Sequence, residues 1–122
     1  MPRNRRELGG RGEMLAAEYL RHLGWDILRM NYLAKGGELD IIARRNGVLL
    51  FAEVKYRTDL SVGHPAESIT REKLRRIRRA ALAYLQSDAC VPHSTLKFDA
   101  VCIIDMPGTD VTLDHIEDIL GP

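Results

Sequence analysis

The alternation of apolar and polar positions divides the chain into helical and extended segments. Apolar residues recur at helical spacing in two stretches, about 7–23 and about 71–87, and predict two helices. Runs of apolar residues bounded by turn-forming residues predict strands at 25–30, 38–45, 48–56, 96–104 and 111–113. This order of elements predicts an α/β fold with a mixed sheet and helices packed on it.

The pair Asn46-Gly47 is the strongest turn signal in the chain. Both central residues of a type I′ turn need positive φ, which Asn and Gly adopt most readily, so a tight hairpin is expected here. If these two residues form the loop, Arg45 faces Val48 and, counting outward, Asp40 lies opposite Glu53. Directly opposed Cβ atoms in a sheet are about 4.5–5.5 Å apart. The second strand of this hairpin is apolar on both faces until Glu53, which is typical of a central strand.

The hairpin register predicts a cluster of charged side chains. Because side chains alternate along a strand, Lys55 and Glu38 are expected on the same face as Asp40 and Glu53. Two carboxylates this close repel each other unless a cation or a shared proton lies between them. We therefore predict that Asp40 and Glu53 bind Mg²⁺ or Mn²⁺, with Lys55 beside them. Strands also end in Glu-x-Lys by chance, and a surface ion-pair cluster is the alternative.

Two further carboxylates are candidates for the same site. Glu13 precedes Ala16 by three residues and Leu20 by seven, so it lies on or beside the buried side of the first helix. A carboxylate there is costly unless a polar group or a metal meets it, so Glu13 is a candidate metal ligand through water. Glu38 is expected either to support the metal ligands from behind or to pair with Lys55, and the first role is favoured.

Charge is distributed unevenly along the 122 residues, although the net charge is only +1. Residues 1–98 contain all 18 basic residues and 11 acidic ones, whereas 99–122 contain six acidic residues and no Lys or Arg. Such asymmetry favours a polyanionic partner. The second helix carries the densest basic group, and like charges spaced i,i+4 destabilise a helix unless something compensates. Nucleic-acid phosphates would do so, and an ordinary solvated face is the alternative. The candidate nucleic-acid-binding residues are Arg71, Arg75, Arg76, Arg78 and Arg79.

Length and hydropathy limit the class of protein. No apolar run approaches the ~20 residues of a membrane span, and no apolar signal core follows the basic start. We expect a cytoplasmic protein without a membrane partner. The length predicts a single domain over 1–122, with a frayed basic segment at 1–6.

Several motifs together resemble known families. The stretch Gly37-Glu38-Leu39-Asp40-Ile41-Ile42, followed by Phe51-Ala52-Glu53-Val54-Lys55-Tyr56-Arg57, resembles the PD-(D/E)xK nuclease signature, with Leu39 in place of its Pro. Three further stretches extend the resemblance to the YraN family of uncharacterised small bacterial proteins, over about 9–104. They are Gly12-Glu13-Met14-Leu15-Ala16-Ala17-Glu18-Tyr19-Leu20, Arg29-Met30-Asn31 and Phe98-Asp99.

The resemblance implies a restriction-endonuclease-like fold, a central mixed sheet flanked by helices, similar to archaeal Holliday-junction resolvases. It implies a metal site formed by Glu13, Asp40, Glu53 and Lys55, and a Mg²⁺-dependent endonuclease that hydrolyses DNA, with branched or single-stranded DNA as candidate substrates. A nuclease fold can also persist as a non-catalytic nucleic-acid-binding module, which is the second hypothesis. The third is a protein-interaction component that docks through its acidic C-terminal segment. A twofold homodimer would suit cutting of two strands, and the sequence leaves the oligomeric state open.

Overall fold

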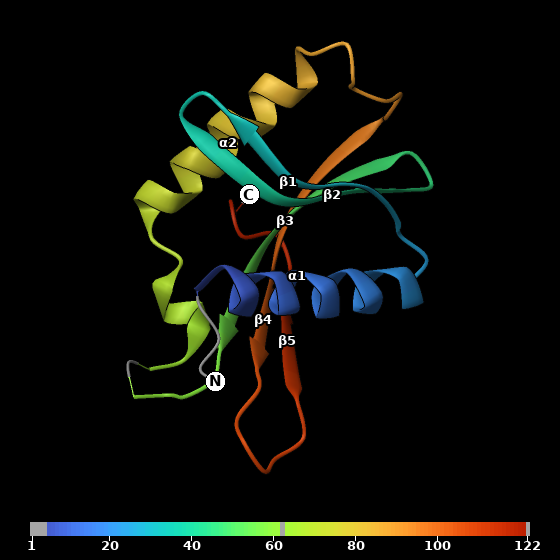
Figure 1. The fold of residues 1–122 in the computed structure, drawn as a ribbon. Helices are drawn as coiled ribbons and strands as arrows, with labels where there is room; N and C mark the ends of the chain where they lie inside the picture. The colour runs from blue at the N-terminus through green and yellow to red at the C-terminus, as the bar shows by residue number, and fades with distance from the viewer. Residues whose placement is uncertain (1–4, 62, 122) are drawn as a thin grey trace.

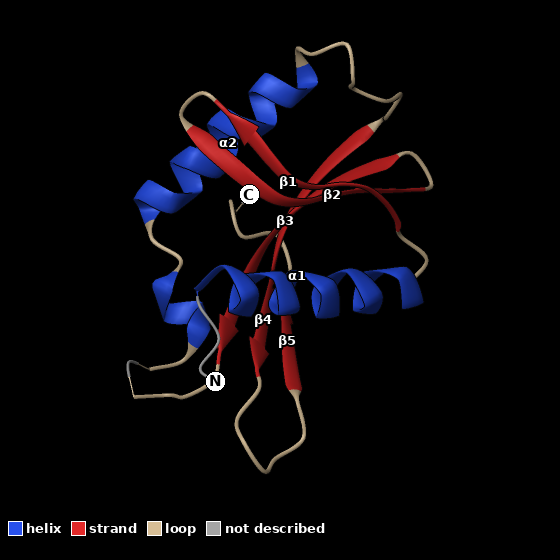
Figure 2. Ribbon diagram, viewed as in Figure 1, coloured by secondary structure: helices blue, strands red, loops and turns tan. Residues whose placement is uncertain are grey.

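The computed structural model describes residues 5–61 and 63–121. Its helices are α1 (Arg5–His22), α2 (Arg71–Leu85) and the short 3-10 helix η1 (Pro65–Ser68). Its strands are β1 (Asp26–Ala34), β2 (Gly37–Arg45), β3 (Val48–Arg57), β4 (Thr95–Ile104) and β5 (Thr112–Ile116) (Figures 1 and 2).

The strands form one five-stranded sheet in the order β1-β2-β3-β4-β5. The pair β3–β4 is parallel, and the other three pairs are antiparallel. Helix α2 provides the crossover that a parallel pair requires. The predicted α/β class with a mixed central sheet is therefore confirmed, and β3 is the central strand, as its apolar faces indicated.

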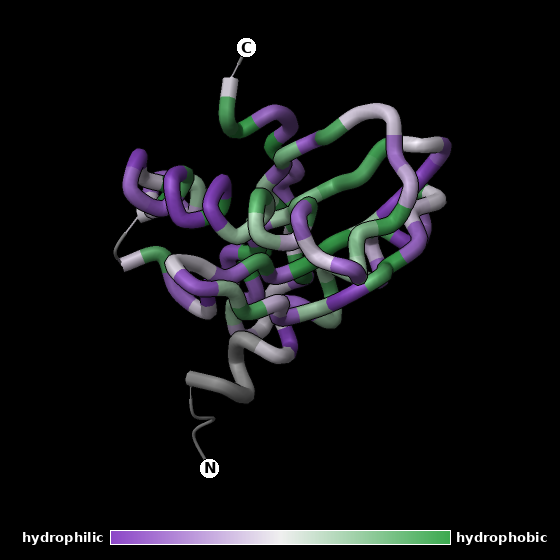
Figure 3. The backbone as a smooth tube through the Cα atoms, turned by 90° about the horizontal axis from the view of Figure 1, so that it is seen from above, coloured by the Kyte–Doolittle hydropathy of each residue, from purple (hydrophilic) through white to green (hydrophobic). Residues whose placement is uncertain are grey.

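Each helix contributes to a different apolar cluster. Ala16 and Leu20 of α1 pack with Leu50 and Val101 of the sheet. The α2 residues Ile77 and Tyr84 belong instead to the cluster around Phe51. In Figure 3 the most hydrophobic stretches follow the interior strands, and long hydrophilic stretches lie at the periphery. None of the helices in 5–61 and 63–121 is long and apolar enough to cross a membrane.

The predicted Asn46-Gly47 turn is confirmed. Both residues have positive φ, 49° for Asn46 and 79° for Gly47. Arg45 pairs with Val48, and the predicted register continues as far as Ile41 opposite Ala52. Local turn chemistry therefore sets the alignment of the two strands that carry the candidate site.

The helix boundaries differ slightly from the prediction. Helix α1 begins at Arg5, inside the segment 1–6 that was predicted to be frayed, and the rest of that segment lies outside the described residues. Helix α2 begins as predicted, with Thr70 as its N-cap, because the Thr70 hydroxyl accepts from the Lys73 amide. It ends two residues before the predicted end, where the Ser87 hydroxyl bonds to the Tyr84 carbonyl.

The strands β1 and β5 are longer than predicted. Strand β1 continues to Ala34 because Tyr32 and Ala34 pack against the apolar cluster of α2. The predicted loop after it shrinks to a tight turn at Lys35-Gly36, where Gly36 has a φ of +91°. Strand β5 continues to Ile116 and brings His115 into the sheet.

Candidate functional site

The two central strands separate at the position of the predicted carboxylates. The last pair between β2 and β3 is Ile41 with Ala52. Beyond it β2 stays paired only with β1, and β3 stays paired only with β4 as far as Arg57. Asp40 and Glu53 are the first residues after the last pair, so both lie at this fork. Figure 1 shows the β1–β2 hairpin and the end of β3 diverging, with α1 crossing nearby.

Asp40 replaces part of the missing strand ladder at the fork. Its Oδ2 accepts a hydrogen bond from the Val54 amide at 2.8 Å. Burial raises the pKa of Asp40 to about 8, helped by the nearby negative charge of Glu53 and, more weakly, of Glu13 and Glu38. A carboxyl in this setting is stabilised by either a proton or a cation. The prediction that Asp40 pairs directly with Glu53 is wrong, because the ladder ends at Ile41 and Ala52, but Glu53 and Glu38 still lie close enough to act on the Asp40 carboxyl.

Lys55 pairs with Glu53, with its Nζ 2.9 Å from the Glu53 carboxylate. Both side chains are largely buried, at 12% and 15% exposure. Burial alone would lower the pKa of Lys55, but a hydrogen bond with Lys73 and the attraction of Glu53 and Asp40 raise it. The ammonium group is therefore held charged beside the carboxylates.

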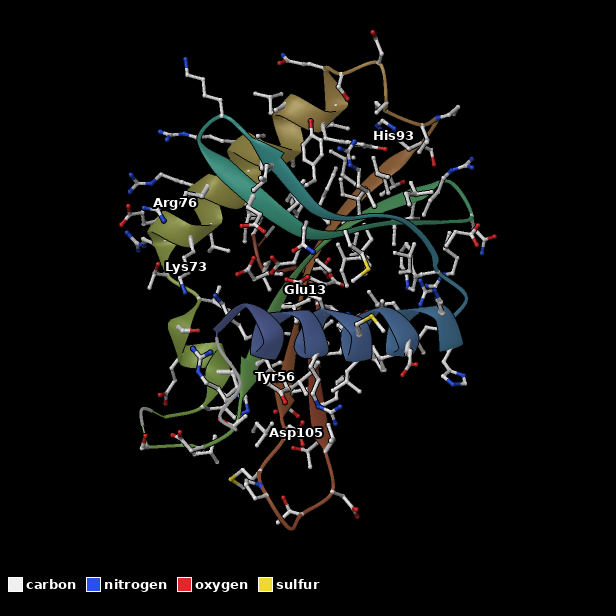
Figure 4. All side chains as sticks on the ribbon, in the orientation of Figure 1. Glu13, Tyr56, Lys73, Arg76, His93 and Asp105 are labelled. Atoms are coloured by element: carbon white, nitrogen blue, oxygen red, sulfur yellow. The ribbon has the colours of Figure 1, made fainter. Side chains whose placement is uncertain are left out.

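Helix α2 adds a second lysine that sequence analysis missed. The pKa of Lys73 is lowered to about 8, chiefly by its contact with Lys55 and then by burial. Lys73 and Arg76 lie on the first half of α2 (Figure 4). They line a cavity of about 390 Å³ together with Leu33, Gly37, Glu38, Asp40, Glu53 and Ile77.

A glycine in β2 explains how the backbone of α2 comes so close to this strand. A Cβ added at Gly37 would collide with the Arg76 carbonyl oxygen, so only glycine allows this approach of helix to strand. A glycine within a strand often marks such a close approach of another backbone. Gly37 was therefore the one feature of the sequence that could have indicated a helix lying against this part of β2. The identity of the approaching helix depends on packing across the sheet, which the local pattern does not specify.

Glu13 reaches the fork from α1. It is half-buried, and burial raises its pKa, with further contributions from Glu38 and Glu53, while a hydrogen bond with Asn31 opposes the shift. Asn31 has a φ of 55°, a left-handed conformation that is uncommon outside glycine. Sequence analysis placed Glu13 correctly beside the buried side of α1 but assigned no role to Asn31. Figure 4 shows Glu13 on α1, with Lys73 and Arg76 on α2.

Contacts between the first half of α1 and the ends of β3 and β4 determine where the Glu13 carboxylate lies relative to the fork. Gly12 packs directly on Tyr56, because a Cβ at Gly12 would lie 2.6 Å from the Tyr56 Cβ. The Tyr56 hydroxyl donates to Asp105 at 2.6 Å, and Arg11 Nε donates to the same carboxylate oxygen at 2.8 Å. Tyr56 and Asp105 thereby tie α1 to the ends of β3 and β4 (Figure 4).

A second acidic group lies away from the fork. Asp99 is fully buried and accepts hydrogen bonds from His115 and from the Asp118 amide. One ligand atom from each of Asp99, His115 and Glu117 lies within 4.8 Å of the others, a geometry able to hold a metal ion. Among side chains that the structure describes, no other set of three meets this condition.

Lys97 already provides a positive charge at this second group. Its Nζ is 3.1 Å from Asp99 and 3.3 Å from Glu117. The side-chain partners of Asp99 are therefore a lysine and a histidine, because the antiparallel pairing of β4 and β5 places His115 beside it.

The carboxylates at the fork fit a hard divalent ion by their chemistry. Asp40, Glu53 and Glu13 supply only oxygen ligands, which Mg²⁺ and Mn²⁺ prefer. Because Asp40 is buried and repelled by the neighbouring carboxylates, a bound cation would stabilise its ionised form. The ligand atoms of the three residues do not all lie within 4.8 Å of one another, so their side chains would have to converge on the ion.

The acidic C-terminal segment is largely neutralised within the molecule. Asp105 pairs with Arg11, and Asp114 lies 2.7 Å from His64. Lys97 contacts three further acidic residues of this segment: Asp99, Glu117 and Asp118. On α2, by contrast, the five arginines are exposed, and the described ion pairs join only Arg76 to an acidic residue, Glu72. Helix α2 therefore carries the densest group of exposed positive charge among the residues whose burial is described.

The mixed sheet with a carboxylate and lysine cluster at its fork is consistent with the nuclease-like fold that the motifs implied. The chain belongs to the uncharacterised protein family UPF0102, whose model matches residues 12–103. It is 40% identical to a UPF0102 protein of Nocardia farcinica over 114 residues, covering 93% of this chain and 89% of the relative. It is 46% identical to one from Chlorobaculum parvum over 97 residues, covering 80% of this chain and 74% of that protein. The resemblance to the YraN family, which is the same family as UPF0102, is thereby confirmed.

Proposed function

We propose that the protein is a metal-dependent endonuclease that hydrolyses phosphodiester bonds in DNA. The observation that carries this proposal is the meeting of Asp40, Glu53 and Lys55 at the fork between β2 and β3. Asp40 and Glu53 share a cavity with the cationic residues Lys73 and Arg76, so carboxylates for a metal and cations for a phosphate line one space. Branched and single-stranded DNA are the first substrates to examine.

Each residue has a role that follows from its position. A divalent ion held by Asp40 and Glu53, with Glu13 as a ligand through water, would neutralise the phosphate and make a bound water more acidic. Asp40 is oriented by the Val54 amide, and Glu13 by Asn31. Lys55, charged and largely buried, is placed to stabilise the negative charge that develops on the phosphoryl oxygens.

The second candidate is a nucleic-acid-binding module without catalysis. The Lys55 ammonium already neutralises Glu53 at 2.9 Å, and this arrangement would persist in a protein that only binds. The third hypothesis, docking through the acidic segment, is less favoured because four of its six acidic residues contact Lys or Arg side chains of the same chain and a fifth contacts His64.

Cleavage assays on labelled branched, nicked, duplex and single-stranded DNA with Mg²⁺ or Mn²⁺ test the proposal. We expect Asp40→Asn and Lys55→Gln each to lower cleavage by about 100-fold or more, while DNA binding in EDTA is retained. Glu18→Gln, on the exposed side of α1, is the matched control and should cleave like the wild type.

Calorimetry separates the two candidates. The wild type should bind Mn²⁺ or Mg²⁺, and the double variant Asp40→Asn/Glu53→Gln should not. The titration is repeated in the presence of a DNA oligonucleotide, to include an ion that enters only with substrate. A folded wild type that binds DNA, binds no metal in either titration and cleaves none of the substrates would establish the binding module instead.

A further inference from the structure

The cationic residues of α2 fall into two rows, which come closest to each other at Arg75 and Arg79. Positions three or four apart are neighbours on a helix, and Lys73, Arg76 and Arg79 form one row. We call this the inner row. Arg71, Arg75 and Arg78 form the other, which we call the outer row. The buried positions Ile77, Ala80 and Ala81 face the sheet. The two rows lie on different sides of this buried face.

Contacts place the inner row between the fork and the β1–β2 turn. Lys73 touches Lys55, and Lys73 and Arg76 line the cavity that holds Asp40 and Glu53. Six residues after Lys73, the Arg79 Cδ is 3.5 Å from the position of a Cβ on Gly36, in the turn that also contains the exposed Lys35. From Lys73 to Arg79 the helix rises by about 9 Å.

The existing partners of the inner row are weak. Arg76 is paired with Glu72 at 2.9 Å, but the two side chains are 59% and 71% exposed. Exposed pairs of this kind are worth about 0–1 kcal/mol, so a phosphate can take the place of Glu72. Within the described ion pairs, the acidic C-terminal segment contacts Arg11, Lys97 and His64 and no member of the inner row.

We propose that a nucleic-acid strand leaves the carboxylate cavity along the inner row, with its phosphates on Lys73, Arg76 and Arg79 and then at Lys35. The strand runs from the fork toward the β1–β2 turn, and the outer row contributes only general attraction. This inference rests on the proposed function, because it assigns the path of the substrate to the same cavity. It divides the five arginines of the sequence prediction into two functional groups.

Two triple variants with the same change in charge test the path. One is Lys73→Gln/Arg76→Gln/Arg79→Gln in the inner row, and the other is Arg71→Gln/Arg75→Gln/Arg78→Gln in the outer row. Glutamine is a good helix former, so both should keep the helix. Binding of a fluorescein-labelled single-stranded DNA is measured by anisotropy in EDTA at several salt concentrations. EDTA excludes cleavage, so binding is scored independently of catalysis.

The inner triple should weaken binding by about tenfold or more and reduce the slope of log K against log salt by about 2, since each lost contact to single-stranded DNA removes about 0.7. The outer triple should weaken binding by less than about threefold with little change in slope. The charge-conserving variant Lys73→Arg/Arg76→Lys/Arg79→Lys should restore binding, which separates lost charge from lost folding.

Equal losses in the two triples, or a larger loss in the outer one, would overturn the proposed path. If cleavage by the wild type depends on Asp40 in that case, the proposed function stands and only the path is wrong. If the wild type does not bind DNA at all at low salt, both the path and the proposed function fail.

Discussion

Asp40 is the residue whose protonation most directly couples the site to the stability of the fold. Its pKa of about 8 exceeds the ordinary value of 3.8 because the carboxyl is buried and faces Glu53. Between these two values the folded state binds a proton that the unfolded state has released. The free energy of unfolding of the metal-free protein therefore contains a contribution that is complete below about pH 4 and is lost as the pH rises toward 8.

Asp40→Asn should remove this pH dependence. Asparagine keeps an oxygen that accepts from the Val54 amide, but it carries no charge. At pH 8 in EDTA we expect the variant to be more stable than the wild type by on the order of 2 kcal/mol, and the difference should shrink toward pH 5. Urea unfolding at a series of pH values measures it, with Glu18→Gln as the control. Parallel pH profiles for wild type and Asp40→Asn would show that the folded carboxyl has no elevated pKa.

At the scale of elements, the position of α1 depends on a glycine rather than on its apolar stripe alone. Gly12 lets the helix rest on Tyr56, and Tyr56 is fixed in turn by Asp105. Glu13 follows Gly12 directly, so the depth of this contact determines where the Glu13 carboxylate meets the fork. A change in the helix packing should therefore alter both stability and the site.

Two glycine substitutions in the same helix separate these effects. Gly12→Ala places a methyl group 2.6 Å from the Tyr56 Cβ and should destabilise the protein by about 1–3 kcal/mol, with a loss of any metal-dependent cleavage. Gly10→Ala meets no atom within 4 Å and should stabilise α1 by up to about 1 kcal/mol, because alanine is the better helix former. Thermal and urea unfolding compare them. If Gly12→Ala is as stable as Gly10→Ala, the close packing on Tyr56 does not constrain α1.

Elements set by local chemistry could be predicted from the sequence. The Asn46-Gly47 turn specified the hairpin and its register, and α2 begins where the apolar spacing predicted, with Thr70 as its N-cap. The end of the β2–β3 ladder at Ile41 and Ala52 could not be predicted, because it depends on which neighbour each strand keeps in the assembled sheet.

Parts of the site that need long-range packing were missed for the same reason. Lys73 reaches Lys55 only because α2 lies against Gly37. His115 reaches Asp99 only because β5 extends beyond its predicted end. Of the predicted site residues, Asp40 and Glu53 were found through a register rule and Glu13 through helical spacing. The arginines of α2 were identified by charge alone and were not resolved into two rows.

At the scale of the whole molecule, two acidic groups are balanced in different ways. The buried Asp99 is neutralised from within by Lys97 and hydrogen-bonded by His115, which in turn contacts Tyr19 of α1. At the fork, Lys55 pairs with Glu53, and the Asp40 carboxylate retains its elevated pKa. The internal lysine should therefore exclude a metal from the Asp99 group, while the fork should accept one.

Lys97→Gln tests this contrast, in the background Asp40→Asn/Glu53→Gln so that the fork binds no ion. Removing the ammonium leaves Asp99, His115 and Glu117 without their internal cation and should destabilise the protein by about 1–3 kcal/mol. The three ligand atoms lie within 4.8 Å of one another and suit Zn²⁺, so added Zn²⁺ should raise the unfolding temperature of this variant. The same background with Lys35→Gln, an exposed lysine, should show no such rise. An equal effect of Zn²⁺ with and without Lys97 would mean that the ammonium does not block the group, and that the protein holds a second metal site beside its buried aspartate.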